Sequence, residues 1–412
     1  MTSLLNHTTL HRLLMIGALL MPILPSPALG ILIALFVLRL FLPEERKLLV
    51  SESIKNRSLL LPVLFYFLYV IGLLWTSNFK YAGLDLQSKI PLLVLPIAIG
   101  SFHNSPDEWQ RIRSFFRYGC LMACTILIVN AIAQYIQSKV PSVFFYTDYS
   151  KPLMHPTYLS IFLSMSILIN LEQMKVSSTP KRMVPVLLEL TFLSANMILL
   201  SARMAMIAAA VIVLISFFYY LYLRSLNSTQ VAGCMGLIIG CVLIYQVANR
   251  FSDRFSQVES AINVSDQPSA RPHNSASGRV EIWKQSLSLL EEYWMTGTGT
   301  GDVKDELMAS YARNNFTYGL ERKLNSHNQF LQTFLTLGIT GLIALLSLFL
   351  VPLLALPPSH RFVFLLFALI TGLNSMTESI LEVQKGVLCF SFFYALTLNN
   401  GIKTYLPEQT NQ

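Results

Sequence analysis

The sequence predicts an all-α integral membrane protein with about twelve transmembrane helices and one large, partly helical loop on the outer side of the membrane. Two observations lead to this fold class. Of the 412 residues, 53% are hydrophobic and only 13% are charged, whereas soluble domains carry about 25% charged residues. In addition, apolar runs of about 20 residues, the length that crosses a bilayer as a helix, recur along the chain.

The apolar runs give twelve predicted spans. They cover residues 12–25, 27–42, 58–76, 86–101, 115–137, 156–171, 184–201, 203–222, 230–248, 327–352, 361–378 and 386–400. The run Val184–Tyr222 holds 39 residues. As one helix it would measure about 58 Å against a bilayer core of about 30 Å, so it must fold back near Ser201 as two spans. The chain thus divides into residues 1–248 with nine spans, an outer loop at 249–326, and residues 327–412 with three spans and a tail.

The distribution of positive charge gives the predicted orientation, because Lys and Arg are enriched on the cytoplasmic side of membrane proteins. With the N-terminus inside, 15 of the 30 Lys and Arg residues fall on the inner side, six on short outer segments and nine in the nearly neutral outer loop. Both termini are therefore expected in the cytoplasm. The net charge of +8 reflects this bias. No basic helix or aromatic–basic motif points to a nucleic-acid partner.

The outer loop is expected to be partly helical. Its stretch 264–278 is rich in turn-forming residues, and residues 279–294 form a predicted amphipathic helix. The apolar stripe of this helix, at i, i+4, i+7 and i+11, consists of Trp283, Leu287, Leu290 and Trp294. A short helix is also expected over 302–313. Between the two lies G-T-G-T-G (297–301), which follows a helix rather than a strand and so fits a dinucleotide-binding fingerprint poorly.

Two arginines on the outer side are candidates for binding an anion. Arg203, in S-A-R-M-A-M, has apolar sequence on both sides, and an arginine at the centre of a span costs about 2.5–3.5 kcal/mol on insertion scales. It could snorkel to the interface as an anchor. A lipid-linked phosphate explains it better, because a guanidinium stays charged and binds two oxygens at once. Arg279 begins the predicted loop helix, whose N-terminus would add N–H donors, or it is a solvated surface residue.

A polar cluster is predicted at the outer mouth of the tenth span. On a helix, His327, Asn328 and Gln332 lie at about 0°, 100° and 140°, within one wedge that would face the protein interior. Imidazole titrates near neutral pH, so His327 could accept a proton from a sugar hydroxyl, although a lone interfacial histidine can also be plain polar packing. Glu378 and Glu382, at i, i+4 near the outer end of span eleven, could orient His327 or an arginine, or cap the helix in water.

Three further residues complete the candidates. Trp283 could rest on a lipid or a sugar face, or pack within the loop. His155, in M-H-P-T-Y before span six, and Lys89, at the start of span four, are outer-mouth polar residues for which interfacial anchoring is the simpler explanation. The five cysteines all fall in predicted spans and indicate small core residues, with no disulfide or metal framework.

Together these features resemble the O-antigen ligase and polymerase superfamily of bacterial inner membranes. The matching segments are S-A-R (201–203), G-R-x-x-x-W (278–283), G-T-G-T-G (297–301) and H-N-x-x-L-Q (327–332). The layout of about twelve spans, cytoplasmic termini and one large periplasmic loop before a late span is similar as well, and H-P-T-Y resembles Bacteroidetes-type members. The resemblance implies a GT-C-like inner-membrane enzyme that transfers glycan from undecaprenyl diphosphate by inverting, metal-independent chemistry without a cofactor.

The resemblance also implies roles for particular residues. Arg203 and Arg279 would grip the diphosphate and stabilise the leaving group, and His327 would deprotonate or orient the acceptor hydroxyl. In a ligase the acceptor is the outer sugar of lipid A–core, on the periplasmic face. Substrate contacts are expected from a further set of residues, namely Lys89, Trp283, Asn328, Gln332, His155 and Glu378.

Two alternatives remain open at this stage. An O-antigen or exopolysaccharide polymerase, or a protein O-oligosaccharyltransferase, shares the same motifs, so the sequence barely separates them from a ligase. A polysaccharide transporter or flippase would need no chemistry, and its charged residues would mark a pathway at the membrane midplane. The notable polar residues of this chain cluster at the outer mouth instead, which favours the enzyme.

Overall fold

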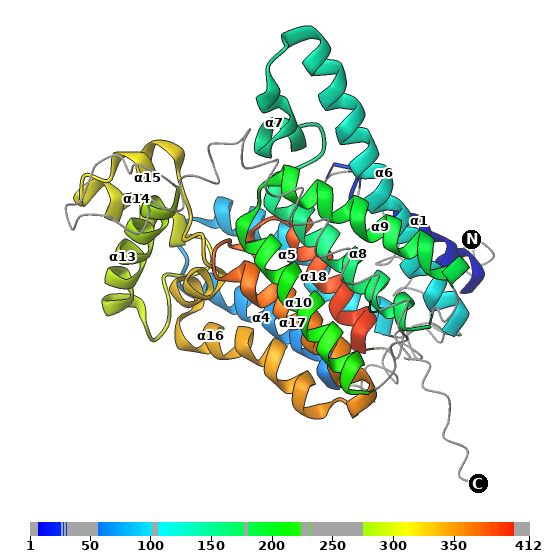
Figure 1. Cartoon of the computed structure of the whole chain (residues 1–412). Coiled ribbons are helices and arrows are strands. Elements are labelled where there is room, and N and C mark those ends of the chain that lie inside the picture. Colours follow the sequence, from blue (N-terminus) through cyan, green and yellow to red (C-terminus); the bar gives the residue numbers. More distant parts are fainter. Residues whose placement is uncertain are drawn as a thin grey trace.

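A computed structural model of the chain describes residues 7–25, 57–100, 106–176, 180–223 and 275–398, with the single positions 28, 30 and 231. Within these ranges the regular structure is helical throughout, with no strand. The all-α fold class is therefore confirmed for the described part of the chain (Figure 1).

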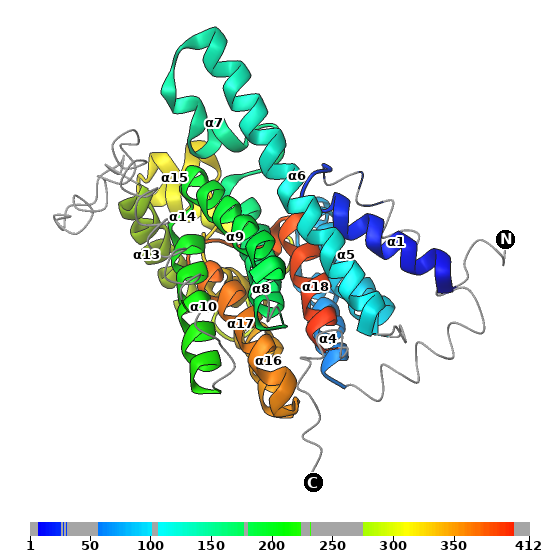
Figure 2. The ribbon, with the colours of Figure 1, turned by 45° about the vertical axis from the view of Figure 1, so that its right-hand side comes forward.

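The helices that precede the outer loop pack into a bundle. They are α1 (His7–Leu20), α4 (Leu61–Ile71), α5 (Phe79–Gly100), α6 (Pro106–Ser138), α7 (Tyr146–Ser150), α8 (Pro156–Val176), α9 (Pro180–Leu200) and α10 (Arg203–Tyr222), with short 3₁₀ helices η2 (Arg57–Leu60), η3 (Gly72–Trp75) and η4 (Pro141–Phe144). The later elements are α13 (Ser275–Tyr293), α14 (Val303–Arg313), α15 (Thr317–Arg322), α16 (Gln329–Ala355), α17 (Pro358–Ser375), η5 (Ile380–Glu382) and α18 (Gln384–Leu398). In both ribbon views α13–α15 lie at one end of the bundle and α1 lies on the opposite side (Figures 1 and 2).

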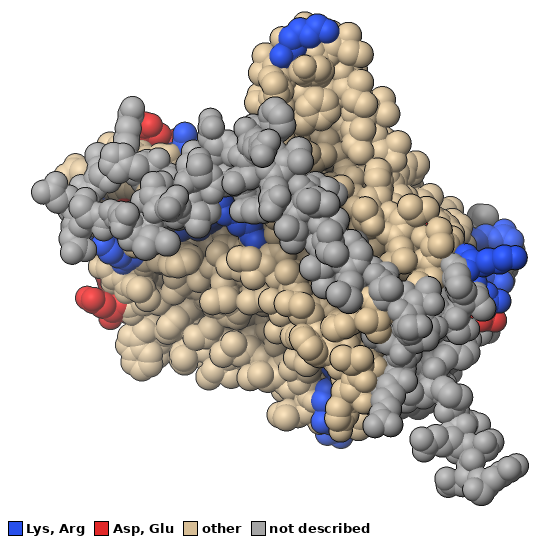
Figure 3. Space-filling view, in the orientation of Figure 1, with Lys and Arg blue, Asp and Glu red and all other residues tan. Residues whose placement is uncertain are grey.

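Six helical segments of the described residues are long and apolar enough to cross a membrane. They are Arg57–Trp75, Phe79–Ile99, Asp107–Ser138, Lys181–Leu200, Arg203–Tyr222 and Gln329–Ala355. Of the predicted spans, 27–42 and 230–248 fall almost wholly outside the described residues, so the number twelve stays a prediction. On the face shown in Figure 3, a wide belt free of charged side chains covers the lower half of the described surface, with charges at its margins. These features are those of a multi-pass membrane protein.

The centre of the bundle is α18, in which every residue from Lys385 to Leu398 is buried. A helix that is apolar on all sides needs protein on all sides, and α18 packs against α5 and α17. The three cysteines in the described residues, Cys120, Cys124 and Cys389, are buried in this core and are not in disulfides, as the sequence predicted. Cys234 and Cys241 lie outside the described residues.

The predicted fold-back at Ser201 is present. Helix α9 ends at Leu200 and α10 begins at Arg203. Ser201 has φ = 50°, the left-handed region that reverses the chain. The connection is two residues long, so the ends of α9 and α10 lie side by side, and Arg203 becomes the first residue of a helix rather than a residue within one.

The glycine-rich segment is a joint that docks the loop on α16. Helix α16 is interrupted at Gly338 (φ 64°, ψ −159°). At this break the Thr298 N–H donates to the Leu335 carbonyl at 2.8 Å, and the Ile339 N–H donates to the Trp294 carbonyl at 2.9 Å. The loop thereby takes over hydrogen bonds that an unbroken helix would make internally, which satisfies the backbone where the helix is interrupted.

Close backbone approach explains the glycines at this joint. A Cβ on Gly338 would lie 2.2 Å from the Met295 carbonyl oxygen, and one on Gly301 would lie 2.1 Å from the Asn78 carbonyl oxygen. No side chain fits either position without moving backbone. The structure thus accounts for G-T-G-T-G by packing, without a nucleotide.

The predicted helix at 302–313 is confirmed as α14, but the stripe predicted for the first loop helix is only half right: Trp283 and Leu290 pack inward, whereas Leu287 and Trp294 do not. On α13 the buried face carries Ile282, Ser286, Leu289 and Leu290. Leu287 and Trp294 of the predicted stripe are 55% and 48% exposed. The buried residues of α13 form a separate cluster with α14 and with Leu335 of α16. The helix carries apolar residues on more than one face, and only the position of α14 and α16 decides which face is covered.

Candidate active site

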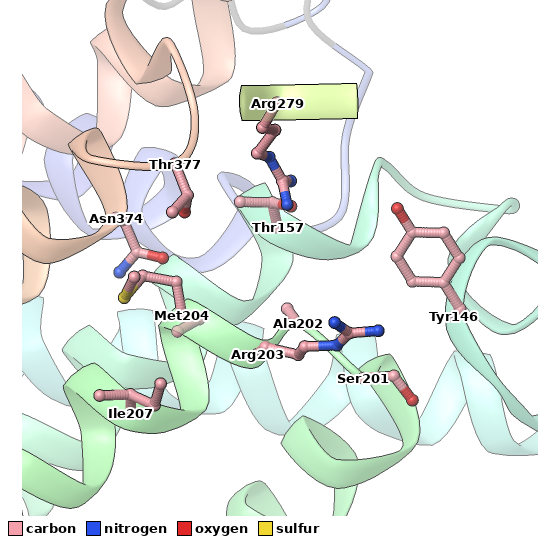
Figure 4. Close-up of a pocket in the computed structure, with 11 residues that line it drawn as sticks. Tyr146, Thr157, Ser201, Ala202, Arg203, Met204, Ile207, Arg279, Asn374 and Thr377 are labelled. Atoms are coloured by element: carbon pink, nitrogen blue, oxygen red, sulfur yellow. The ribbon is translucent and has the colours of Figure 1, made fainter. Parts of the chain in front are cut away.

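A cavity of about 200 Å³ lies where the ends of several helices meet. Its walls come from α7, the start of α8, the α9–α10 connection, the end of α17 and α13 (Figure 4). The lining residues are Tyr146, Thr157, Ser201, Ala202, Arg203, Met204, Ala205, Ile207, Arg279, Asn374 and Thr377. The predicted topology assigns all these helix ends to the outer side, and the structure brings them together at one place.

The two predicted arginines line the same cavity. Arg203 extends from the start of α10 toward Tyr146, and Arg279 reaches in from α13 on the opposite wall (Figure 4). They are 76 positions apart in the chain, and both are half-buried. The α10 N-terminus, with Arg203–Ala205 in its first turn, adds backbone N–H groups and the positive end of the helix dipole. The cavity therefore has the charge and the donors to hold an anion.

One detail of the Arg279 prediction is wrong. Helix α13 begins at Ser275, so Arg279 lies in its second turn and does not open the helix. The N–H donors expected beside Arg279 consequently belong to the start of α10. This could not be predicted, because S-A-S-G before Arg279 contains turn-forming residues that are helical here.

His327 faces the carboxylate of Glu378. The Nδ1 atom of His327 lies 3.4 Å from a Glu378 carboxylate oxygen, and the Glu378 side chain is 9% exposed. Burial alone would raise the pKa of Glu378, but contact with His327 and the charges of His327, His155 and Arg279 outweigh burial, so this pKa lies below its ordinary value of 4.5. Glu378 follows Thr377, which lines the cavity. The carboxylate therefore links the histidine to the arginine site.

His327 is not on the helix, so the predicted helical wedge is wrong. The backbone of His327 has φ = 42°, and α16 begins at Gln329 with Asn328 as its N-cap. The Asn328 side chain accepts hydrogen bonds from the N–H groups of Phe330 and Leu331 at 2.9 and 3.2 Å. Asn is a strongly preferred N-cap residue, and this signal in the sequence marks the true start of the helix. Asn328 thus has a structural task beside any contact with substrate.

The turn before His327 is held by two other predicted residues. The buried Gln332 accepts hydrogen bonds from the N–H and the hydroxyl of Ser326, at 3.1 and 2.8 Å. Trp283 donates its indole N–H to the Ser326 carbonyl at 3.1 Å, and its ring packs against the cluster of loop helices. A left-handed residue persists only where its neighbours fix it. Gln332 and Trp283 fix the residue directly before His327.

The structure does not bring Lys89 to the cavity. Its side chain is fully buried, with Nζ 3.1 Å from a Glu382 carboxylate oxygen, a second ion pair to Asp85, and the Tyr69 ring centroid 4.4 Å away. Glu382 and Glu378 are also not on one helix, because α17 ends at Ser375. The expectation that the two glutamates share one helix is therefore wrong.

His155 lies beside the cavity rather than in its wall. It is exposed, and its ring makes edge contacts with Tyr146 and Tyr158 at centroid distances of 5.9 and 6.2 Å. Tyr146 itself lines the cavity and was missed by sequence reasoning. Its backbone has φ = 53°. Six non-glycine residues in the described ranges have positive φ, and three of them, Tyr146, Ser201 and His327, lie at or next to the cavity. Such strain gathers at functional sites, but only coordinates reveal it.

Among the described residues, no group of three or more His, Cys, Asp or Glu side chains has the arrangement of a metal site. The polar groups that converge on the cavity are instead two guanidinium groups, hydroxyls, an amide and the neighbouring His327–Glu378 pair.

Comparison with known families agrees with the resemblance noted in the sequence. The family model described as O-antigen ligase matches residues 190–346, a little under two fifths of the chain. The matched segment contains Arg203, Arg279, Trp283 and His327, whereas Lys89, His155 and Glu378 lie outside it. No curated protein matches the chain. Residues 190–346 are therefore similar to the O-antigen ligase family, which is consistent with the superfamily of membrane glycosyl-transfer enzymes that comprises O-antigen ligases and polymerases.

Proposed function

We propose that this protein is an O-antigen ligase that transfers a glycan from undecaprenyl diphosphate to a sugar hydroxyl of lipid A–core. The observation that carries the proposal is the meeting of Arg203 and Arg279 on one cavity with the His327–Glu378 pair beside it. On this proposal the chain lies in the bacterial inner membrane, with cytoplasmic termini and a periplasmic cavity.

The diphosphate of the donor would bind between the two arginines. Each guanidinium can donate two hydrogen bonds to phosphate oxygens, and the start of α10 adds N–H donors from below. These groups act most strongly when negative charge develops on the diphosphate as it leaves. The α9–α10 reversal sets the backbone position of Arg203, and the packing of α13 sets that of Arg279.

The acceptor hydroxyl would lose its proton to His327. Since Nδ1 of the histidine faces Glu378, the other ring nitrogen, Nε2, is left to accept the proton. The hydroxyl oxygen attacks the anomeric carbon and forms the new glycosidic bond. The bond from that carbon to the diphosphate oxygen breaks, and its electron pair leaves with the diphosphate. Attack opposite to the leaving group inverts the anomeric configuration, and Glu378 stabilises the imidazolium that forms.

The direct test is transfer in vitro with the purified full-length protein. A defined lipid-linked glycan and lipid A–core are incubated with and without a chelator, and the joined product is measured. We expect transfer that the chelator leaves unchanged, and loss of transfer in Arg203→Ala, Arg279→Ala and His327→Ala at normal protein levels. Arg313→Ala, on the exposed side of α14, is the matched control. Wild-type transfer in all three site variants would refute the mechanism.

Deletion of the gene separates the ligase from its relatives. A ligase deletion leaves free lipid A–core, with polymeric glycan retained on the lipid carrier. Lipopolysaccharide with a single repeat would indicate a polymerase. Normal lipopolysaccharide with unglycosylated protein would indicate an oligosaccharyltransferase. If the purified, folded protein transfers no glycan in vitro, transport remains as the alternative function.

A further inference from the structure

A buried polar network joins α5 and α16 to the connection between α17 and α18. This connection, residues 376–383, carries Glu378 near its start and Glu382 near its end. At its far end the Glu382 carboxylate pairs with Lys89 of α5 at 3.1 Å, and the Leu381 N–H donates to the side-chain oxygen of Gln329 at 2.7 Å. Gln329 is the first residue of α16, so two different helices hold adjacent residues of one connection.

The middle of the connection, Glu378 to Leu381, is buried, whereas Met376 and Val383 at its two ends are exposed. Ile380 and Leu381 are 2% and 1% exposed. The carbonyl oxygen of Ile380 lies so close to Gly386 that a Cβ there would approach it to 2.0 Å. At the near end the Glu378 N–H donates to the Asn374 carbonyl at 3.0 Å, which ties the connection to the end of α17. The Glu378 carboxylate is thus set by contacts at both ends of an eight-residue connection with little freedom between them.

Charge argues against a direct role of Lys89 in binding the donor. Its single ammonium group is fully buried and already faces the carboxylates of Asp85 and Glu382. A phosphate brought to this place would meet two acidic groups and would have to displace at least one of them. Buried ion pairs are costly to break, because the partner left behind is an unpaired charge.

We propose that Lys89 is a positioning residue, which holds Glu382 and thereby fixes the 376–383 connection so that Glu378 meets His327. This assignment rests on the proposed function for its kinetic consequence, but its structural part can be tested without any transfer reaction. The sequence suggested that Lys89 contacts the donor phosphate. On this proposal Lys89 instead binds Glu382, and through the connection it positions Glu378 against His327.

The informative variant is Glu382→Gln. It removes the charge that ties the connection to Lys89, so this tie is reduced to at most a neutral hydrogen bond, and it leaves Lys89 paired with Asp85, one positive charge with one negative charge. Misplacement of a catalytic group by about 1 Å can cost about a hundredfold in rate. We therefore expect a ten- to hundredfold lower kcat, with the KM for the lipid-linked donor unchanged. Glu292→Gln, on the exposed side of α13, is the matched control and should keep wild-type values.

A second measurement reports on the connection itself. A cysteine introduced by Thr377→Cys, next to Glu378, is labelled with a water-soluble maleimide, and the parent protein gives the background from its own cysteines. We expect labelling to be several-fold faster when Glu382→Gln is added. Gln329→Met removes the other anchor without changing charge. This variant should also lower kcat and speed up the labelling of the cysteine at position 377. The test can therefore continue even if the Glu382→Gln variant fails to fold.

The outcomes are separable. If the wild type transfers glycan and either anchor variant keeps its kcat, or changes only the donor KM, Lys89 is not a positioning residue. Equal labelling rates with and without the anchors overturn the proposal as well, whatever the kinetics. If the wild type shows no transfer at all, the proposed function fails, and the labelling comparison alone decides whether Lys89 fixes the connection.

Discussion

Replacement of Glu378 by Gln removes the carboxylate that faces the histidine of the candidate site. The side chain keeps its shape and can still accept a hydrogen bond, but it loses its negative charge. The His327 Nδ1 atom lies 3.4 Å from this carboxylate. The substitution therefore leaves the geometry of the turn in place and removes the electrostatic stabilisation of an imidazolium at His327.

The expected size of the effect follows from this distance. Two unit charges 3.4 Å apart interact by about 5 kcal/mol at an effective dielectric constant of about 20. This is an upper bound, because the His327 side chain is 25% exposed and water screens the pair. The proton is also only partly transferred in the transition state. About half of the interaction, about 2–3 kcal/mol, is then lost, which corresponds to a decrease in kcat of about 30- to 150-fold.

The assay is transfer from a lipid-linked glycan to lipid A–core at neutral pH, with kcat and both KM values determined. Glu291→Gln, an exposed glutamate of α13, is the control and should be indistinguishable from wild type. The KM for the donor should not change, because the arginines remain in place. If Glu378→Gln retains more than half of the wild-type kcat, the carboxylate does not support a proton acceptor at His327, and the reasoning is refuted.

Four further predictions concern stability and chemistry. Gly338→Ala should destabilise the fold by about 1–3 kcal/mol, since the new Cβ meets the Met295 carbonyl. Gly83→Ala in α5 is the control: a Cβ there meets nothing within 4 Å, so this variant should stabilise the fold by about 0.5–1 kcal/mol. Equal Tm shifts in the two variants would contradict the docking of the loop on α16. Gln332→Leu leaves the Ser326 N–H and hydroxyl without their acceptor, which should cost about 1–3 kcal/mol in thermal unfolding and lower kcat; an unchanged Tm would show that the turn is held by other contacts. The pKa of Glu378 is lowered from 4.5 by the cationic groups around it, so its contribution to stability is present above that pH and is lost as the pH falls through the lowered value. Wild-type Tm should accordingly drop more steeply below about pH 4.5 than that of Glu378→Gln, and parallel curves would rule this out. A chelator should leave the rate of transfer unchanged, and a loss that Mg²⁺ restores would contradict the proposed metal-independent step.

Several features of the fold and the site could be predicted because they depend on local sequence. Span length follows from hydropathy and the bilayer thickness, which is why the 39-residue run had to fold back and does so at Ser201. Arg203 stood out by a local cost, that of a charge beside apolar sequence, and Arg279 by its position at the start of a predicted helix. His327 stood out by its polar neighbours at the start of an apolar run. The structure brings Arg203 and Arg279 onto one cavity and His327 next to it.

Other predictions failed where local patterns allow two solutions. The stripe predicted on α13 is right for Trp283 and Leu290 and wrong for Leu287 and Trp294, because apolar residues occur on more than one face of that helix and its partner helices decide which of them are covered. The wedge of His327, Asn328 and Gln332 assumed one continuous helix, whereas the N-cap at Asn328 leaves His327 in a turn. In both cases the pattern does indicate a nearby helix, but it does not contain the exact start of that helix or the partner helices that cover it.

By itself, the sequence determined the all-α membrane class of the protein, through apolar runs of membrane length, and it indicated the candidate residues, namely arginines and a histidine at span ends. Only the tertiary structure decided which residues act together. It placed Glu378 against His327, Tyr146 in the wall of the cavity, and Lys89 in a buried ion network away from it. The physical reason is that span length and charge bias act along the chain, one residue at a time. Pairing depends on close packing between segments that the sequence leaves far apart.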